Sequence, residues 1–120
     1  MVLADTSVWV DHLRRGNPHL AAQLEQEGVL THPFVIGELA CGGIRNRKEI
    51  LTLLKALPAV GMVPHADAIG LLESFGLFDR GLGWIDIHLL AAARSNGYSL
   101  WTLDKTLKAA AGELGVEASF

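Results

Sequence analysis

Two apolar segments, far apart in this sequence, are each followed directly by an aspartate. Val2-Leu3-Ala4 precedes Asp5, and the run from Leu100 to Leu103 precedes Asp104. Such runs are typical of short buried strands, and ligands in an open parallel α/β sheet bind at the carboxyl ends of the strands. We therefore expect both carboxylates to point into one site at the end of a sheet.

Two further carboxylates belong to predicted helices, where their surroundings decide how costly a negative charge is. Asp86 stands at the start of a predicted helix, where unpaired backbone N–H groups favour its ionised form. Glu38 lies inside the apolar stretch from Phe34 to Ala40, where an unpaired charge would be costly. The small residues at 91–93 would let the helix after Asp86 approach the sheet closely. The candidates for one shared acidic cleft are Asp5, Glu38, Asp86 and Asp104.

Four carboxylates in one cleft repel one another unless they take up protons or share a cation. Ligand sets made only of oxygen atoms select hard ions, so we expect the cation to be Mg²⁺ or Mn²⁺. An ion of this kind lowers the pKa of a bound water and neutralises charge at a phosphoryl oxygen. The chemistry predicted from these residues is hydrolysis of a phosphodiester.

Each acid also has a purely structural explanation. Asp5 and Asp86 both suit the N-cap position of a helix, and Asp104 suits a turn before a helix. Glu38 could pair with an arginine of the basic stretch 45–48. The joint arrangement of the four acids, and no single one of them, favours the metal site.

The elements that must position these acids alternate between short strands and helices. This order predicts an α/β fold with a short central parallel sheet and helices on both faces. A sheet covered on both faces also explains a hydrophobic fraction of 50% and a mean hydropathy of +0.30. Strands are expected over 1–4, 29–31, 59–63, 98–103 and 116–118, and helices over 7–15, 20–27, 33–42, 48–57, 65–78, 87–96 and 105–114.

Length and composition restrict the class of protein. The 120 residues predict one domain spanning 1–120. No apolar run approaches the roughly 18 residues that cross a bilayer, and the N-terminus lacks the pattern of a secretory signal. The single Cys41 cannot form an intrachain disulfide. A cytoplasmic protein without membrane association is expected.

The charge pattern bears on nucleic-acid binding in two opposite ways. A net charge of -3 argues against it, because phosphate binding usually needs a basic surface. The clusters 14–15 and 45–48 could still guide phosphates toward an acidic cleft, or they could be solvated helix ends. For Trp9, Trp84 and Trp101 we expect core packing rather than base stacking, and for Cys41 a buried position rather than a nucleophilic role.

Taken in order along the chain, these motifs resemble the PIN-domain family, and within it the small ribonuclease toxins of VapC type. The resemblance spans nearly the whole chain. The matching residues are Asp5-Thr6-Ser7, Pro33 with Gly37-Glu38-Leu39, Asp86 with Leu90-Ala91-Ala92, and Thr102-Leu103-Asp104.

The resemblance implies a PIN fold and cleavage of RNA that depends on Mg²⁺ or Mn²⁺. It also implies a homodimer and a VapB-type antitoxin whose tail blocks the acidic site. By matching position, the four acids would be the catalytic and metal-binding residues, and the match supports Asp5 and Asp86 best as metal ligands. The hydroxyls of Thr6, Ser7 and Thr102 would orient the ligands or a water.

Three other functions compete with this one. A receiver-like signalling module needs its phosphate-accepting Asp at the end of a central strand, whereas the segment 59–63 ends in Pro64 and His65. A phosphatase with an Asp nucleophile needs a second acid two residues later, where Ser7 stands. A PIN-like module that only binds partners would have no need of all four acids.

Overall fold

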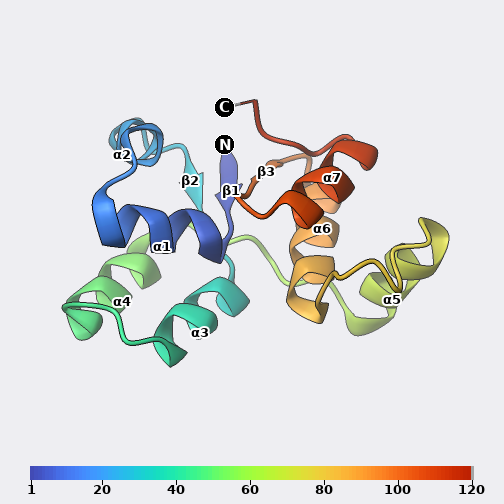
Figure 1. Cartoon of the computed structure of the whole chain (residues 1–120), viewed down its shortest axis with the longest axis horizontal. Coiled ribbons are helices and arrows are strands. Elements are labelled where there is room, and N and C mark those ends of the chain that lie inside the picture. The colour runs from blue at the N-terminus through green and yellow to red at the C-terminus, as the bar shows by residue number, and fades with distance from the viewer. Residues whose placement is uncertain (120) are drawn as a thin grey trace.

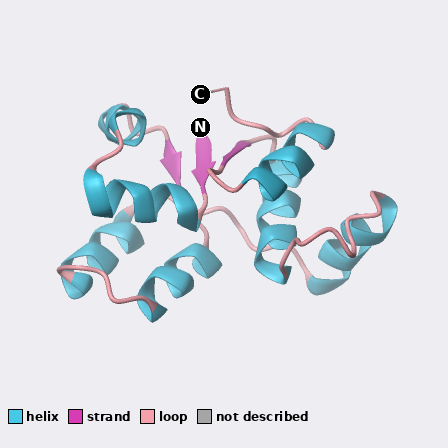
Figure 2. Ribbon diagram, in the orientation of Figure 1, coloured by secondary structure: helices cyan, strands magenta, loops and turns pink. Residues whose placement is uncertain are grey.

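The computed structural model describes residues 1–119 and has three short strands at its centre, with helices gathered on both sides (Figures 1 and 2). In Figure 1, α1 to α4 lie to the left of the strands and below them, and α5 to α7 lie to the right. The elements in chain order are β1 (Val2–Ala4), α1 (Thr6–Arg15), α2 (Pro18–Glu25), β2 (Val29–Leu30), α3 (Pro33–Cys41), α4 (Arg47–Ala56), α5 (His65–Ser74), α6 (Trp84–Asn96), β3 (Ser99–Trp101) and α7 (Lys105–Glu113).

The sheet is parallel, with β1 between its two neighbours in the order β2-β1-β3. Leu3 at its middle pairs with Leu30 on one side and with Leu100 on the other. Because all three strands run in the same direction, their carboxyl ends share one edge of the sheet. The residues that follow the strands at this edge are polar and buried: Asp5, Thr31 and Thr102. The expected α/β fold with a short parallel sheet is confirmed.

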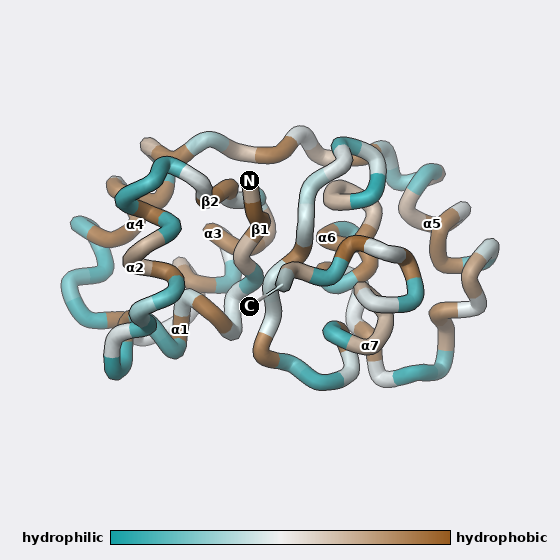
Figure 3. Tube along the Cα trace, turned by 90° about the horizontal axis from the view of Figure 1, so that it is seen from above, coloured by the Kyte–Doolittle hydropathy of each residue, from teal (hydrophilic) through white to brown (hydrophobic). Residues whose placement is uncertain are grey.

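The core is built around the strands and α6. Every residue from Ile87 to Ala93 is buried, so the middle of this helix is enclosed on all sides. It packs against β3, α5 and α7, and its small residues 91–93 allow the close approach expected from the sequence. Figure 3 shows brown, apolar chain at β1 and β2 in the middle of the molecule. No helix within residues 1–119 is long and apolar enough to cross a membrane.

Two of the expected strands are reduced to isolated bridges. In the segment 59–63 only Ala59 pairs, with Thr31, and the chain then leaves the sheet. Gly61 has no side chain to pack and Pro64 has no N–H to donate, so neither favours a longer ladder. In the segment 116–118 a single bridge joins Glu117 to Leu100.

Several boundaries and burial expectations are also wrong. Helix α5 ends at Ser74 instead of residue 78, because Gly76 adopts the left-handed conformation with φ 59°. Helix α6 begins at Trp84, so Asp86 lies within its first turn and is not its N-cap. Trp9 and Trp101 are buried as expected, but Trp84 is 38% exposed, and Cys41 is exposed.

Candidate active site

Asp5 lies at the carboxyl-end edge of the sheet with both carboxylate oxygens hydrogen-bonded. Its Oδ1 accepts from the backbone N–H of Ser7 at 2.9 Å and of Val8 at 3.4 Å, and also from the Ser7 hydroxyl. Its Oδ2 accepts from the Thr102 hydroxyl at 2.7 Å. Asp5 is therefore the N-cap of α1, as its structural explanation required, and Oδ2 makes a second link, to the chain beyond β3.

The hydroxyls around Asp5 join two segments that are distant in sequence. Ser7 Oγ lies 3.3 Å from Thr102 Oγ1, across a separation of 95 residues. The backbone N–H of Leu103 donates to Ser7 Oγ at 2.9 Å, and that of Asp104 donates to Thr102 Oγ1 at 3.0 Å. The sequence placed Ser7 and Thr102 around the acids, and the structure brings both of them to Asp5. Their functional role stays a prediction.

Asp86 approaches the same edge from the first turn of α6. Its Oδ2 accepts from the backbone N–H of Gly83, the N-cap of this helix, at 2.9 Å. Burial raises the pKa of Asp86, and the negative charges of Asp104, Asp5 and Glu38 raise it further, against the lowering effect of the Gly83 hydrogen bond. The other three predicted carboxylates therefore lie near enough to act on Asp86.

Glu38 and Asp104 occupy the exposed part of this cluster. Glu38 accepts a hydrogen bond of 2.6 Å from the Thr6 hydroxyl, which ties α3 to α1. Asp104 caps α7 by accepting from the backbone N–H of Leu107 at 3.0 Å. The expectation that Glu38 is buried in an apolar helix is wrong, because Val35 and Leu39 form the buried face of α3 and Glu38 lies outside it.

The cluster has the donor chemistry of a site for a hard divalent cation. Burial raises the pKa of Asp5, although its hydrogen bonds lower it, so ionisation of Asp5 and Asp86 is costly without a neutralising charge. None of the three ion pairs within residues 1–119 includes any of the four acids. In that same part of the chain, however, no three acidic, His or Cys side chains stand close enough to hold one ion as they are placed. The donor set fits Mg²⁺ or Mn²⁺, while its coordination sphere is not closed.

Sequence reasoning missed the group that holds Asp86. The N–H of Gly83 orients this carboxylate, and the signal was present, since an acid three residues after an N-cap is the spacing of a capping box. The apolar walls of a neighbouring cleft, described below, were missed as well, whereas its two arginines belong to the basic clusters 14–15 and 45–48 noted in the sequence. The apolar residues lie on α1, on α3 and in the loop after α3, and no local motif joins them.

Comparison with known proteins places this chain in a family. The PIN domain family model matches residues 2–113. The chain is 44% identical over 117 residues to Ribonuclease VapC32 of Mycobacterium tuberculosis, in two strains, covering 97% of this chain and 94% of that protein.

Two solved structures share the fold at low sequence identity. PAE2754 from Pyrobaculum aerophilum gives a TM-score of 0.65 at 17% identity, covering 97% of this chain and 96% of the other. Mycobacterium tuberculosis VapC20, described as a sarcin-ricin loop cleaving toxin, gives a TM-score of 0.63 at 20% identity, covering 92% of this chain and 95% of the other. The family-model match over residues 2–113 and the identity of 44% to Ribonuclease VapC32 show that the chain belongs to the PIN-domain family, in its VapC group.

Proposed function

We propose that this chain is a VapC-type endoribonuclease that hydrolyses RNA phosphodiesters with Mg²⁺ or Mn²⁺ at Asp5, Glu38, Asp86 and Asp104. The nuclease activity is supported by the identity of 44% to a protein named Ribonuclease VapC32 over nearly the full length of both chains. The acidic site is supported by one observation above all. Burial raises the pKa of Asp86, and the negative charges of Asp104, Asp5 and Glu38, from three other segments of the chain, raise it further.

The four acids would have different roles in binding the metal and the substrate. Asp5 is held from both of its oxygens, so it would offer a fixed ligand, and Asp86 would offer the second ligand from α6. Asp104 and Glu38 are exposed and would face the substrate side of the site. A bound divalent ion would supply a water of lowered pKa and would neutralise charge on the phosphoryl oxygens. Ser7 and Thr102 would hold Asp5 in position, and Thr6 would hold Glu38.

The expected partners follow from the VapC group. The substrate would be RNA, and a VapB-type antitoxin would block the acidic site. We also expect a homodimer. Exposed, unpaired Cys41 suits a reducing compartment, which agrees with a cytoplasmic location for an enzyme that acts on RNA.

The test is cleavage of RNA by the purified chain and by Asp5→Asn. Wild type should cleave with Mg²⁺ or Mn²⁺ and stop when EDTA is added. Asp5→Asn should lose more than the roughly 10- to 100-fold that follows removal of an outer partner of a metal ligand. It should unfold at an equal or higher temperature, since Asn also caps helices well and the costly buried charge is gone.

The matched control is Asp79→Asn. Asp79 is exposed, lies between α5 and α6 and is not among the charges that act on Asp86, and Asn tolerates its positive φ of 57°. This variant should cleave at the wild-type rate. Wild-type activity in Asp5→Asn would refute the site. A wild-type chain that is folded and metal-loaded but leaves RNA intact would favour the alternative of a non-catalytic PIN-like binding module.

A further inference from the structure

A cleft of about 370 Å³ opens beside the acidic site, between α1, α3 and the loop that follows α3. It shares Thr6 and Glu38 with that site, so the hydrogen bond of 2.6 Å between these two side chains forms the border between cleft and acids. The cleft is therefore continuous with the place where we expect the scissile phosphate.

The walls of the cleft are suited to the flat face of a base. Val10 and Leu13 of α1 line one part of it, and Leu39 and Ile44 line another. Gly42 and Gly43 widen the opening, because glycine has no side chain to fill it. Its volume falls within the range of roughly 300–1,000 Å³ that is usual for small-ligand sites, which are mostly apolar with a few polar groups.

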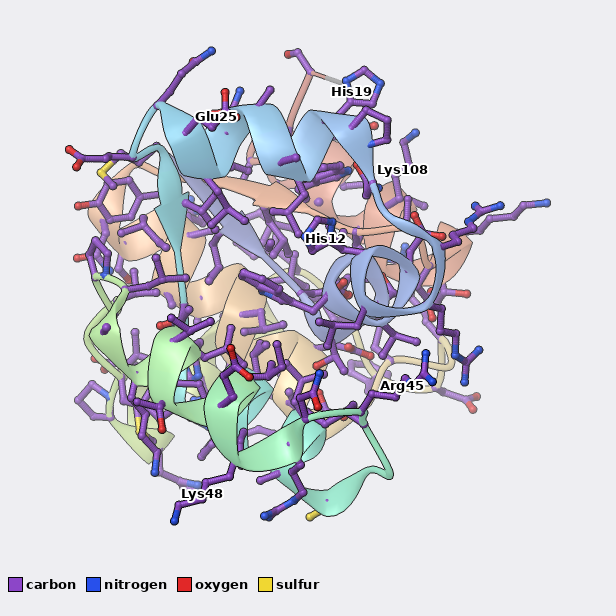
Figure 4. All side chains as sticks on the ribbon, turned by 90° about the vertical axis from the view of Figure 1, so that its left-hand side faces the viewer. His12, His19, Glu25, Arg45, Lys48 and Lys108 are labelled. Carbon is purple, nitrogen blue, oxygen red and sulfur yellow. The ribbon has the colours of Figure 1, made fainter. Side chains whose placement is uncertain are left out.

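Two arginines give this cleft the charge that the acidic site lacks. Arg14 on α1 and Arg45 in the loop after α3 both line it, and Figure 4 shows Arg45 in the region between these two elements. Both side chains are exposed, and neither takes part in an ion pair within residues 1–119. Guanidinium groups bind phosphate through paired N–H donors. Positive charge next to an acidic cluster also offsets the repulsion between that cluster and a polyanion.

We propose that this cleft is the subsite for the nucleotide that flanks the scissile phosphate of the RNA. The base packs on Val10, Leu13 and Ile44, while Arg14 and Arg45 bind the adjoining phosphate. This assignment rests on the ribonuclease activity proposed above and adds the residues that select and hold its substrate. A peptide of a protein partner would use the same apolar walls, but RNA also accounts for the two arginines and for the continuity with the acids.

The first experiment compares cleavage kinetics of the full chain and its charge variants. For Arg14→Gln combined with Arg45→Gln we expect KM to rise about 10-fold with kcat within about twofold, because these side chains bind the ground state and the transition state alike. The dependence of log KM on log salt should become shallower by about 0.7, since each neutralised phosphate of a single strand contributes roughly 0.7 to this slope. A purely structural defect would not change the slope.

The control replaces two arginines that face elsewhere. Arg15 pairs with Asp11 on α1, and Arg47 donates to the carbonyl of Ala40. Arg15→Gln combined with Arg47→Gln removes the same net charge from the same two regions, so KM and its salt dependence should stay near the wild-type values. Equal effects of the two double variants would overturn the subsite, since charge alone would then explain the result.

The second experiment detects the base directly and needs no cleavage. The four nucleoside 5′-monophosphates are titrated into the EDTA-treated chain, and the methyl resonances of Val10, Leu13 and Ile44 are followed by NMR. We expect these methyls to shift and those of Leu53, which is 58% exposed on α4, to stay in place. Ile44→Ser should reduce the chemical-shift changes of the Val10 and Leu13 methyls and alter the base that is preferred beside the cleavage site.

These two experiments separate failure of the subsite from failure of the nuclease. RNA cleavage with unchanged cleft methyls and unchanged KM in the arginine double variant would overturn the subsite and leave the activity standing. Methyl shifts without any cleavage would support a nucleotide site and refute the nuclease. Methyls that respond to a synthetic peptide of alternating Glu and Leu, but to none of the nucleotides, would assign the cleft to a protein partner and overturn the proposal.

Discussion

The acidic site has two sides that differ in how firmly their oxygens are held. On the tied side, formed by Asp5, Ser7 and Thr102, every carboxylate oxygen is hydrogen-bonded and Asp5 is only 5% exposed. On the open side, formed by Glu38, Asp86 and Asp104, each carboxylate accepts one hydrogen bond within the described chain and none is fully buried.

The difference follows from the elements that carry each side. The tied side sits at the ends of β1 and β3, where the paired backbones fix the distance between the two strands. The open side comes from the first turn of α6, the N-cap of α7 and the surface of α3. A fixed ligand reduces the cost of ordering the site, while exposed carboxylates can adjust to an ion and a substrate. This arrangement explains why the donor chemistry is complete although no three groups of the described chain converge on one point.

Among variants that keep all four acids, the largest effect should come from removing a hydroxyl on the tied side. Thr102→Val keeps the shape but deletes the donor to Asp5 Oδ2 and the acceptor for the N–H of Asp104. We expect RNA cleavage to fall by roughly 10- to 100-fold, as for outer partners of metal ligands, and the unfolding free energy to fall by about 1–3 kcal/mol for unsatisfied buried groups.

Thr6→Val is the matched change on the open side, because it deletes one hydroxyl bond to an exposed carboxylate. Its activity should fall by only a few-fold, with stability within about 0.5 kcal/mol of wild type. Rates and urea unfolding of the two variants measure the contrast. Equal losses in both would show that the two sides do not differ in the way we describe.

The residues of the acidic site show which of its features can be predicted from the sequence. The positions of Asp5 and Asp104 after strands could be predicted, since an apolar run that ends in an acid is a local pattern. The contact between Ser7 and Thr102 could not, because it joins segments 95 residues apart through strand pairing. Glu38 was misplaced because the composition of α3 was considered without its buried face, which Val35 and Leu39 define at a spacing of four.

For the fold, too, features set by local sequence could be predicted, whereas those set by long-range pairing could not. The helices around strongly periodic segments were predicted, and so were the buried strands β1 and β3. The segment 59–63 has strand-forming residues but makes one bridge, since β2 itself has only two residues to pair with it. Trp84 was expected in the core, but the earlier start of α6 places it at the first, exposed turn of that helix.

A metal ion should stabilise the chain most where both sides are ionised. The raised pKa values of Asp5 and Asp86 mean that the folded chain binds protons more readily than the unfolded one. Their contribution to stability is therefore fully present below the ordinary pKa of 3.8 and is lost as the pH rises through the raised values. A bound cation reverses this loss.

We expect saturating Mg²⁺ to add about 2.7 kcal/mol at a hundredfold excess over Kd near neutral pH, or on the order of 10 °C in Tm, and much less near pH 4. Thermal unfolding with Mg²⁺ or EDTA measures the gain. Asp86→Asn should raise the Tm in EDTA and reduce the gain from Mg²⁺, whereas Asp79→Asn should change neither. A gain that does not depend on pH would contradict a site made of these carboxylates.

The smallest effect concerns the helix that carries Glu38 to the open side. Helix α3 is capped by His32, whose Nδ1 accepts from the backbone N–H of Phe34 at 3.0 Å. Burial, together with the smaller effect of the His88 charge, lowers the pKa of His32 from 6.5 to about 4. The folded chain thus resists protonation, so the stability from His32 is present above pH 6.5 and is lost as the pH falls toward 4.

Replacing His32 by Asn isolates this contribution, because Asn keeps an N-cap acceptor and does not titrate. Between about pH 7.5 and pH 5.5, wild type should lose roughly 1 kcal/mol more unfolding free energy than His32→Asn, by the linkage relation. Urea unfolding at the two pH values gives the difference, in which the opposite trends of Asp5 and Asp86 cancel. If His32→Asn follows wild type, then neutral His32 does not support α3, and the open side rests on the Thr6 bond and core packing alone.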